Sequence, residues 1–125
     1  MTSSADELVT EFCKKWATPD PEELAGYFTE DAVYHNIPMP AVTGKAAIKD
    51  IFGLFIPPAE KIEFEVVGLA VCDHTVFTER VDRFVIAGRE VELPVAGVFE
   101  IEGGRIKAWR DYFDFATWQR QTGAA

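Results

Sequence analysis

The stretch TVFTERVDRFVI (Thr75–Ile86) indicates both the fold and the candidate site. Its residues alternate in the manner of a β-strand, with Arg80, Asp82 and Phe84 on one face. A carboxylate among large apolar neighbours is costly unless it is paired. We therefore expect this chain to use Asp82 rather than merely to tolerate it.

A second stretch, IKAWRDYFDF (Ile106–Phe115), alternates in the same way. It places Asp111 on one face of a predicted strand, between Trp109 and Phe113. The chain thus has two acidic residues at positions where an apolar core is expected.

The segments next to these two stretches complete a sheet. Ile62–Val71 and Glu90–Ile101 also alternate, and short turns separate all four segments. This pattern predicts an antiparallel meander. Pro94 cannot donate a backbone hydrogen bond, so its segment is expected to be an edge or to contain a bulge.

The first half of the chain has a helical period instead. Ser4 with Glu7 resembles a capping box, and Pro21 after Asp20 is typical of a helix start. An extended segment is expected over 31–36, and helices after Ser4, after Asp20, over Gly44–Phe55 and over Ala116–Gln121. Helices followed by a long curved meander predict an α+β domain, with three helices on one face of a bent sheet that encloses a pocket.

Composition restricts the classes of function. The 125 residues are expected to form one domain, 1–125, and the net charge of −9 argues against binding nucleic acid or anionic membranes. No basic segment precedes an apolar run at the N-terminus, and no apolar stretch reaches the length of a membrane span. Cys13 and Cys72 lack metal or redox spacing, so we expect two buried thiols in a reducing cytoplasm.

Polar groups from several predicted elements face the expected pocket: Tyr34, Asn36, Arg80, Asp82 and Asp111. One arginine between two buried carboxylates leaves a net charge of −1, which favours one proton on the pair. The result is a protonated acid beside an ionised base, while Tyr34 and Asn36 could hydrogen-bond a water molecule. The remaining lining is expected to be apolar: Trp16, Phe52, Phe55, Phe84, Leu93, Val95, Trp109, Phe113 and Trp118.

Other ionisable residues fit less well. His35 is expected to point away from Tyr34, and His74 lies in a turn, so neither is a good base or metal ligand, and no metal is expected. Asp114 and Arg110 fall on the face opposite Asp111 and are interpreted as surface charges. A serine-hydrolase mechanism is excluded because the only serines are Ser3 and Ser4, far from any nucleophile elbow.

Three short motifs together resemble the limonene-1,2-epoxide hydrolase family: Tyr34-His35-Asn36, Arg80-Val81-Asp82 and Trp109-Arg110-Asp111-Tyr112-Phe113-Asp114. No single motif is specific, but their order and spacing are, and the resemblance covers nearly the whole chain. It implies the cone-shaped α+β barrel shared with nuclear transport factor 2 and ketosteroid isomerase.

The resemblance also implies a reaction. Epoxides would be hydrolysed to vicinal diols in one step, without cofactor, metal or covalent intermediate. Asp82 would be the acid at the epoxide oxygen and Asp111 the base toward water, with Arg80 bridging them and Tyr34 and Asn36 holding the water. Small alicyclic or terpenoid epoxides, a homodimer and a cytoplasmic location are the corresponding expectations.

Two alternatives stay open from the residues. A ketosteroid-isomerase-like enzyme would use a base and an oxyanion hole, but it has no evident use for an arginine between both carboxylates. A non-catalytic binding module would keep the apolar pocket and typically lose the acid-base residues.

Overall fold

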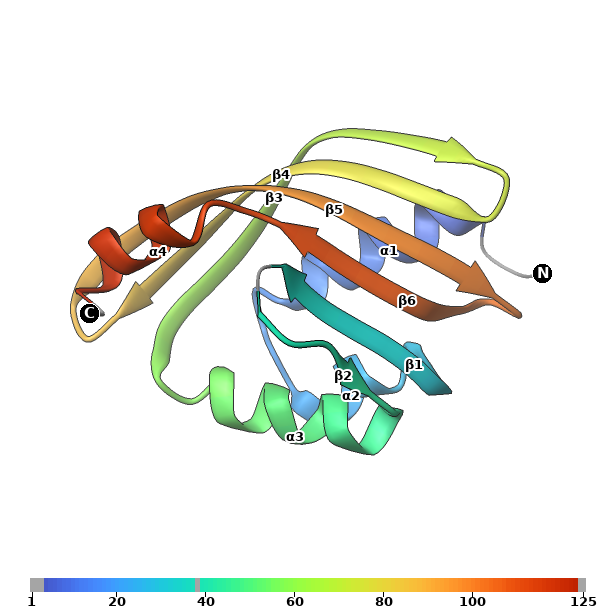
Figure 1. Cartoon of the computed structure of the whole chain (residues 1–125), viewed down its shortest axis with the longest axis horizontal. Helices are drawn as coiled ribbons and strands as arrows, with labels where there is room; N and C mark the ends of the chain where they lie inside the picture. The colour runs from blue at the N-terminus through green and yellow to red at the C-terminus, as the bar shows by residue number, and fades with distance from the viewer. Residues whose placement is uncertain (1–3, 38, 124–125) are drawn as a thin grey trace.

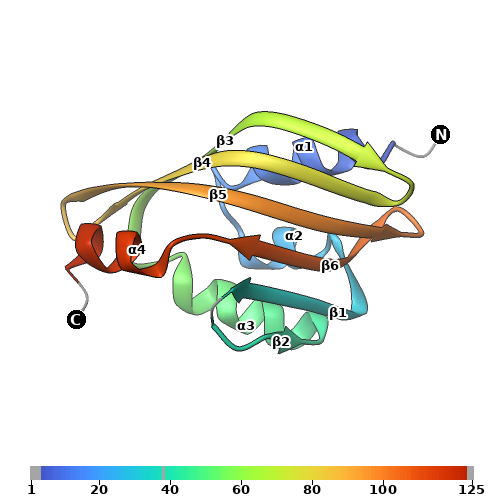
Figure 2. The same cartoon turned by 45° about the horizontal axis from the view of Figure 1, so that its top comes forward.

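The computed structural model describes residues 4–37 and 39–123. Its centre is a six-stranded, strongly curved sheet with the strand order β2-β1-β6-β5-β4-β3 (Figures 1 and 2). The strands are β1 (Phe28–Ile37), β2 (Val42–Thr43), β3 (Ala59–Cys72), β4 (Thr75–Ile86), β5 (Arg89–Glu102) and β6 (Arg105–Tyr112). The helices are α1 (Ala5–Lys15), α2 (Pro21–Ala25), α3 (Lys45–Phe55) and α4 (Phe115–Thr122).

The predicted meander is confirmed, because β3, β4, β5 and β6 pair antiparallel in sequence order. β1 then adds to β6 in the parallel sense, and this pairing makes the sheet mixed. The last strand ends at Tyr112 rather than at Phe115, which instead begins α4. The two-residue β2 was not expected from the sequence.

Pro94 lies where the sequence placed it, on a local edge. Residues 89–95 of β5 pair with β4 on one side, while pairing with β6 begins only at Ala96. α4 covers part of this free edge: the Gln121 side chain accepts from the Glu92 backbone N–H at 2.6 Å and donates to the Glu92 carbonyl at 2.7 Å.

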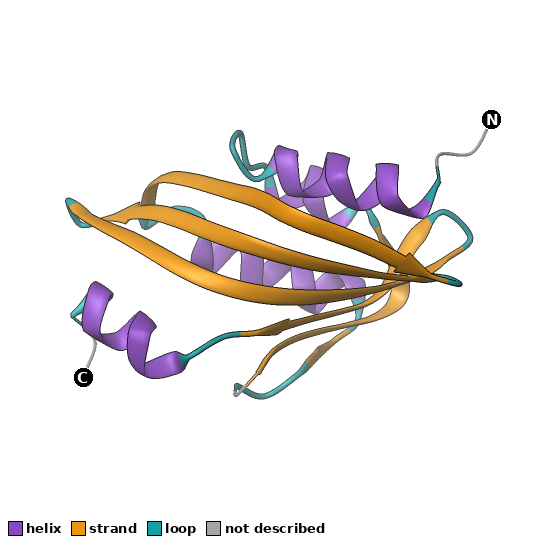
Figure 3. Ribbon diagram, turned by 90° about the horizontal axis from the view of Figure 1, so that it is seen from above, coloured by secondary structure: helices purple, strands orange, loops and turns teal. Residues whose placement is uncertain are grey.

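Helices α1 and α3 lie along the same side of the sheet, and α4 lies apart from them, near the turn between β4 and β5 (Figures 1 and 3). The Asp20 carboxylate accepts from the Glu22 backbone N–H at 3.0 Å, which confirms the start of α2. The capping box at α1 was wrong: Ser4 Oγ makes no cap bond and donates to the Glu7 carboxylate at 2.6 Å.

The core lies between the sheet and these helices, and its largest buried side chains are aromatic: Phe12, Trp16, Phe28, Phe52, Phe99 and Trp109. Full burial of one such side chain stabilises the fold by about 1.5–3 kcal/mol. Cys13 belongs to this core, and burial raises the pKa of its thiol to about 12. The expectation for Cys72 was wrong, because it is exposed at the end of β3, where the alternation turns it outward.

No helix in the described ranges is long and apolar enough to cross a membrane.

Candidate active site

A cavity of about 290 Å³ opens between the concave face of the sheet and helices α3 and α4. Tyr34, Asn36, Asp82 and Asp111 form its polar part. These four residues come from β1, β4 and β6, and Asn36 is the register partner of Asp111 in the parallel β1–β6 pair. The structure therefore brings together the polar residues singled out in the sequence.

Arg80 lies behind the two carboxylates and is fully buried. Its Nε and Nη2 donate to the two oxygens of Asp82 at 3.0 and 2.8 Å. Its Nη1 and Nη2 donate to the two oxygens of Asp111 at 3.1 and 2.8 Å, and Nη1 also donates to Thr78 Oγ1 at 3.3 Å. Because a guanidinium has five N–H groups, every donor of Arg80 is used, and the geometry of both carboxylates is fixed from one side.

Aromatic rings surround the guanidinium as well. Arg80 Cζ lies 5.0 Å from the centre of the Phe64 ring, 5.8 Å from that of Trp109 and 6.0 Å from that of Phe99. These contacts exclude water and favour the cation. Burial opposes the charge, but Asp111 and Asp82 outweigh it and raise the pKa of Arg80 well above its usual value.

The two carboxylates differ in their partners. Among the residues that the structure describes, Arg80 is the hydrogen-bond donor to Asp82, whereas Asp111 accepts from Arg80 and also from Trp109 Nε1 at 2.6 Å. Burial, together with the neighbouring charge of Asp111, raises the pKa of Asp82 to about 6, although Arg80 opposes the shift. Asp82 is therefore the carboxyl of the two whose raised pKa favours holding a proton, and Asp111 is the one with the additional hydrogen-bond donor.

Tyr34 and Asn36 form a pair in the cavity lining, together with the two carboxylates. Asn36 Nδ2 donates to Tyr34 Oη at 2.8 Å. Burial and the charge of Asp111 raise the pKa of Tyr34, so its hydroxyl stays protonated at neutral pH. Both side chains can offer hydrogen bonds to a water molecule close to Asp111.

Gly97 makes this packing possible, and the sequence reasoning missed it. It lies in β5 directly between Thr78 of β4 and Asp111 of β6. A Cβ at this position would lie 2.3 Å from Arg80 Nη1, 2.8 Å from Asp111 Oδ1 and 2.9 Å from Thr78 Oγ1. A glycine inside a strand is a known signal of close approach by another group, and here that group is the guanidinium.

Most of the apolar lining agrees with the sequence. Trp16, Phe55, Phe84, Leu93, Val95, Phe113 and Trp118 line the cavity, and Met39, Ile51, Phe64 and Phe115 join them without having been predicted.

Two residues expected in this lining do not line the cavity. The Trp109 ring is completely buried, stacked between Tyr34 at 4.5 Å and Phe99 at 5.4 Å across three strands. Its position on the inner face was right, but it lies beneath the cavity and supports the lining residues Tyr34 and Asp111. Phe52 is likewise buried in the core, where its ring lies edge-on to the Trp16 ring with the ring centres 5.0 Å apart.

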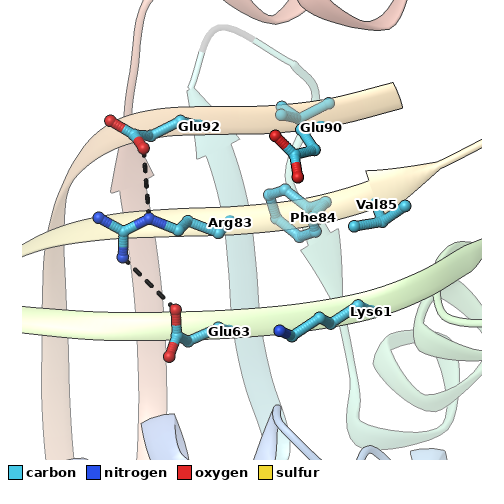
Figure 4. Close-up of a pocket in the computed structure, with 8 residues that line it drawn as sticks. Lys61, Glu63, Arg83, Phe84, Val85, Glu90 and Glu92 are labelled. Carbon is cyan, nitrogen blue, oxygen red and sulfur yellow. Dashed lines mark hydrogen bonds and ion pairs between the residues drawn. The ribbon is translucent and has the colours of Figure 1, made fainter. Parts of the chain in front are cut away.

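A second pocket, of about 430 Å³, lies over β3, β4 and β5 around Arg83, whose side chain alternates to the face opposite that of Asp82 (Figure 4). Arg83 pairs there with Glu92 at 3.3 Å, Glu63 at 3.4 Å and Glu65 at 2.7 Å. These side chains are exposed, and such pairs contribute little to stability. Arg110, which pairs with Glu100 at 2.5 Å, and Asp114, which accepts from Thr117 at 2.6 Å, likewise stay outside the site.

Comparison with known proteins agrees with the geometry of the candidate site. A family model described as the limonene-1,2-epoxide hydrolase catalytic domain matches residues 4–123. Epoxide hydrolase EphG of Mycobacterium tuberculosis is 54% identical over 39 residues, which are 31% of this chain. The match spans only 26% of the length of that relative.

Solved structures match over almost the whole chain. A limonene-epoxide-hydrolase-like epoxide hydrolase from M. tuberculosis has a TM-score of 0.84 and 28% identity, covering 98% of this chain and 95% of that one. A protein with a ketosteroid isomerase-like fold from Catenulispora acidiphila, solved with trimethylamine, has a TM-score of 0.86 and 21% identity, covering 98% and 96%. A protein assigned as a SnoaL-like polyketide cyclase from Shewanella putrefaciens has a TM-score of 0.86 and 14% identity, covering 100% of both chains. The last two likenesses concern the fold alone, and they agree with the cone-shaped α+β architecture.

Proposed function

The chain belongs to the limonene-1,2-epoxide hydrolase family, and from this we propose that it hydrolyses small hydrophobic epoxides to vicinal diols in one step, with water as the nucleophile. The observation that carries the proposal is the network around Arg80, in which one guanidinium holds two carboxylates in a cavity that is otherwise apolar. Alicyclic and terpenoid epoxides are the first substrates to consider.

Opening an epoxide requires a proton at the oxygen and a nucleophile that approaches opposite the bond that breaks. In the proposed mechanism, Asp82 donates its proton to the epoxide oxygen. Asp111 removes a proton from a water molecule held by Tyr34 and Asn36, and that water attacks an epoxide carbon. Each proton transfer contributes about 10²–10⁴-fold in rate.

Arg80 has two roles in this proposal. It fixes the acid and the base relative to each other, so that water and epoxide can meet in line. Its single positive charge also leaves the two carboxylates with one negative charge in excess, which is why one of them can hold a proton near neutral pH. The apolar lining excludes bulk water and binds the hydrocarbon part of the substrate.

Chiral gas chromatography of cyclohexene oxide and limonene 1,2-epoxide incubated with the purified protein tests the proposal, with the Asp111→Asn variant beside it. We expect an excess of one diol enantiomer from the wild type and only the background racemate from the variant. Diol formation at equal rates by both proteins would contradict the assignment of Asp111.

Assembly into a homodimer and a cytoplasmic location remain predictions. Light scattering of the purified chain measures the first directly, with twice the mass of 14.0 kDa as the expected result.

A further inference from the structure

The apolar part of the cavity contains an unusual concentration of aromatic rings. Five of the lining residues contact one another in a closed circuit, which we call the aromatic wall: Trp16, Phe55, Phe64, Phe84 and Trp118. They come from five different segments of the chain, namely the end of α1, then α3, β3, β4 and α4. A surface assembled from five segments is a property of the tertiary structure, and no single motif contains it.

The wall combines two stacked pairs of rings with edge-on contacts between them. Trp16 stacks on Phe64 with the ring centres 5.0 Å apart and the ring planes at 19°. Trp118 stacks on Phe55 with the ring centres 6.4 Å apart and the planes at 28°. Phe84 joins the two stacks edge-on, 6.2 Å from Phe64 and 5.6 Å from Trp118. The rings are thus held in different orientations around one cavity, and an aromatic ligand can pair with them edge-to-face or offset-stacked.

The wall is adjacent to the proposed acid. Phe64 is the register partner of Asp82 on β3, and Phe84 lies two residues farther along the same face of β4. On the other side, the register partner of Asp82 is the aliphatic Leu93 of β5. Phe64 and Phe84 are therefore the aromatic side chains nearest Asp82 along the sheet, within reach of a substituent on an epoxide whose oxygen binds this carboxyl group.

We propose that this site prefers epoxides that carry an aromatic ring on an epoxide carbon, an inference that rests on the proposed hydrolysis. The water oxygen bonds to the benzylic carbon as the C–O bond breaks, and the electron pair stays on the epoxide oxygen, which takes the proton of Asp82. Asp111 receives the proton of the water, and a proton returns from Asp111 to Asp82 before the next turnover. Positive charge developing on the benzylic carbon is stabilised by the ring faces and by the negative charge that develops on Asp82 as it gives up its proton.

Styrene oxide and cyclohexyloxirane test this preference, because they share one carbon skeleton and differ only in the aromaticity of the ring. Affinity is measured by calorimetric titration of the Asp111→Asn protein, so that the higher intrinsic reactivity of a benzylic epoxide does not enter. One additional aromatic contact predicts that styrene oxide binds about fivefold tighter. Equal affinity, or tighter binding of cyclohexyloxirane, would overturn the preference.

Two variants in the same background separate aromaticity from cavity size. Phe84→Leu removes one ring of the wall and should lower the ratio of the two affinities toward one, with Phe64 still in place. Val95→Ala enlarges the same cavity without removing a ring, and should weaken both ligands together while the ratio persists. A ratio that persists in Phe84→Leu would show that the wall does not cause the preference.

The wild-type protein distinguishes failure of this inference from failure of the proposed function. Diol formation from both epoxides with equal affinities would leave the hydrolase standing and overturn the aromatic preference. Tighter binding of styrene oxide with no diol from any epoxide, cyclohexene oxide included, would overturn the hydrolase and leave an aromatic binding site.

Discussion

Replacement of Gly97 by alanine tests whether the site depends on the close packing of Arg80. The new Cβ would lie 2.3 Å from Arg80 Nη1, and since ordinary contact begins at 3.4 Å, this nitrogen must retreat by about 1.1 Å. Its bonds to Asp111 and Thr78 are already 3.1 and 3.3 Å long, so a movement of this size breaks at least one of them. The obstacle is a fully buried side chain rather than a flexible surface group, so it cannot simply swing away.

The structure sets the expected size of the effect. Loss of a hydrogen bond between charged groups costs about 1.5–3 kcal/mol, which for a domain of this length lowers the melting temperature by about 10 °C. A displacement of about 1 Å in a group that orients the reacting partners costs about 10² in rate. We therefore expect Gly97→Ala to lower kcat/KM for cyclohexene oxide about 100-fold and to lower the melting temperature of the protein.

Gly53→Ala is the matched control, because it adds the same methyl group in α3, where nothing lies within 4 Å. It should leave the rate unchanged and stabilise the helix slightly. Chiral gas chromatography and thermal unfolding are run on both variants in parallel. A Gly97→Ala protein with the activity and melting temperature of Gly53→Ala would refute the reasoning.

Four further predictions follow from the same network. Asp82→Asn and Asp111→Asn should each reduce diol formation at least 10³-fold while circular dichroism shows an intact fold; residual activity within tenfold of the wild type would contradict the role of that residue. Arg80→Lys should be nearly as severe, because an ammonium cannot hold two carboxylates as a fork does; near-normal kinetics would remove the bridging role. The raised pKa of Asp82, about 6, predicts that kcat/KM falls as pH rises through 6; a profile that rises there would assign the acid elsewhere. Changing the size of Leu93 or Phe113 should alter the diol enantiomer ratio more than the melting temperature, and an unchanged ratio across several substitutions would exclude them from substrate contact.

The same raised pKa has a consequence for stability. Between the ordinary value of 3.8 and about 6, the folded state binds the proton of Asp82 more tightly than the unfolded state does. The stabilisation is therefore fully present below the lower value and is lost as pH rises through the upper one. The Asp82→Asn variant should lack this component, visible as a flatter dependence of melting temperature on pH between 4 and 7.

The sequence predicted the fold and the convergence of the polar residues, and for a physical reason. Strand alternation has a period of two, so the faces of β4 and β6 follow directly from the order of residues, and Arg80, Asp82 and Asp111 converge as expected. The meander depends on short turns that can be recognised locally. The fold class follows from these two signals.

The features that were missed depend on contacts between distant segments. Whether Trp109 lines the cavity or lies beneath it depends on Tyr34 and Phe99 in the neighbouring strands. Phe64 alternates inward like its neighbours, but its place beside Asp82 depends on the β3–β4 register. Gly97 had a signal in the sequence, a glycine within a strand, but the group that it accommodates became clear only from the structure.

Hydrolysis of cyclohexene oxide in H₂¹⁸O, with the protein in excess over substrate, tests the central claim most directly. If Asp111 acts as a base and water attacks the carbon itself, the diol from the first turnover carries one ¹⁸O atom and the protein carries none. If instead a carboxylate attacked and formed an ester that was later hydrolysed, the first diol would be unlabelled and the ¹⁸O would be found by mass spectrometry in Asp82 or Asp111. That second result would contradict the account.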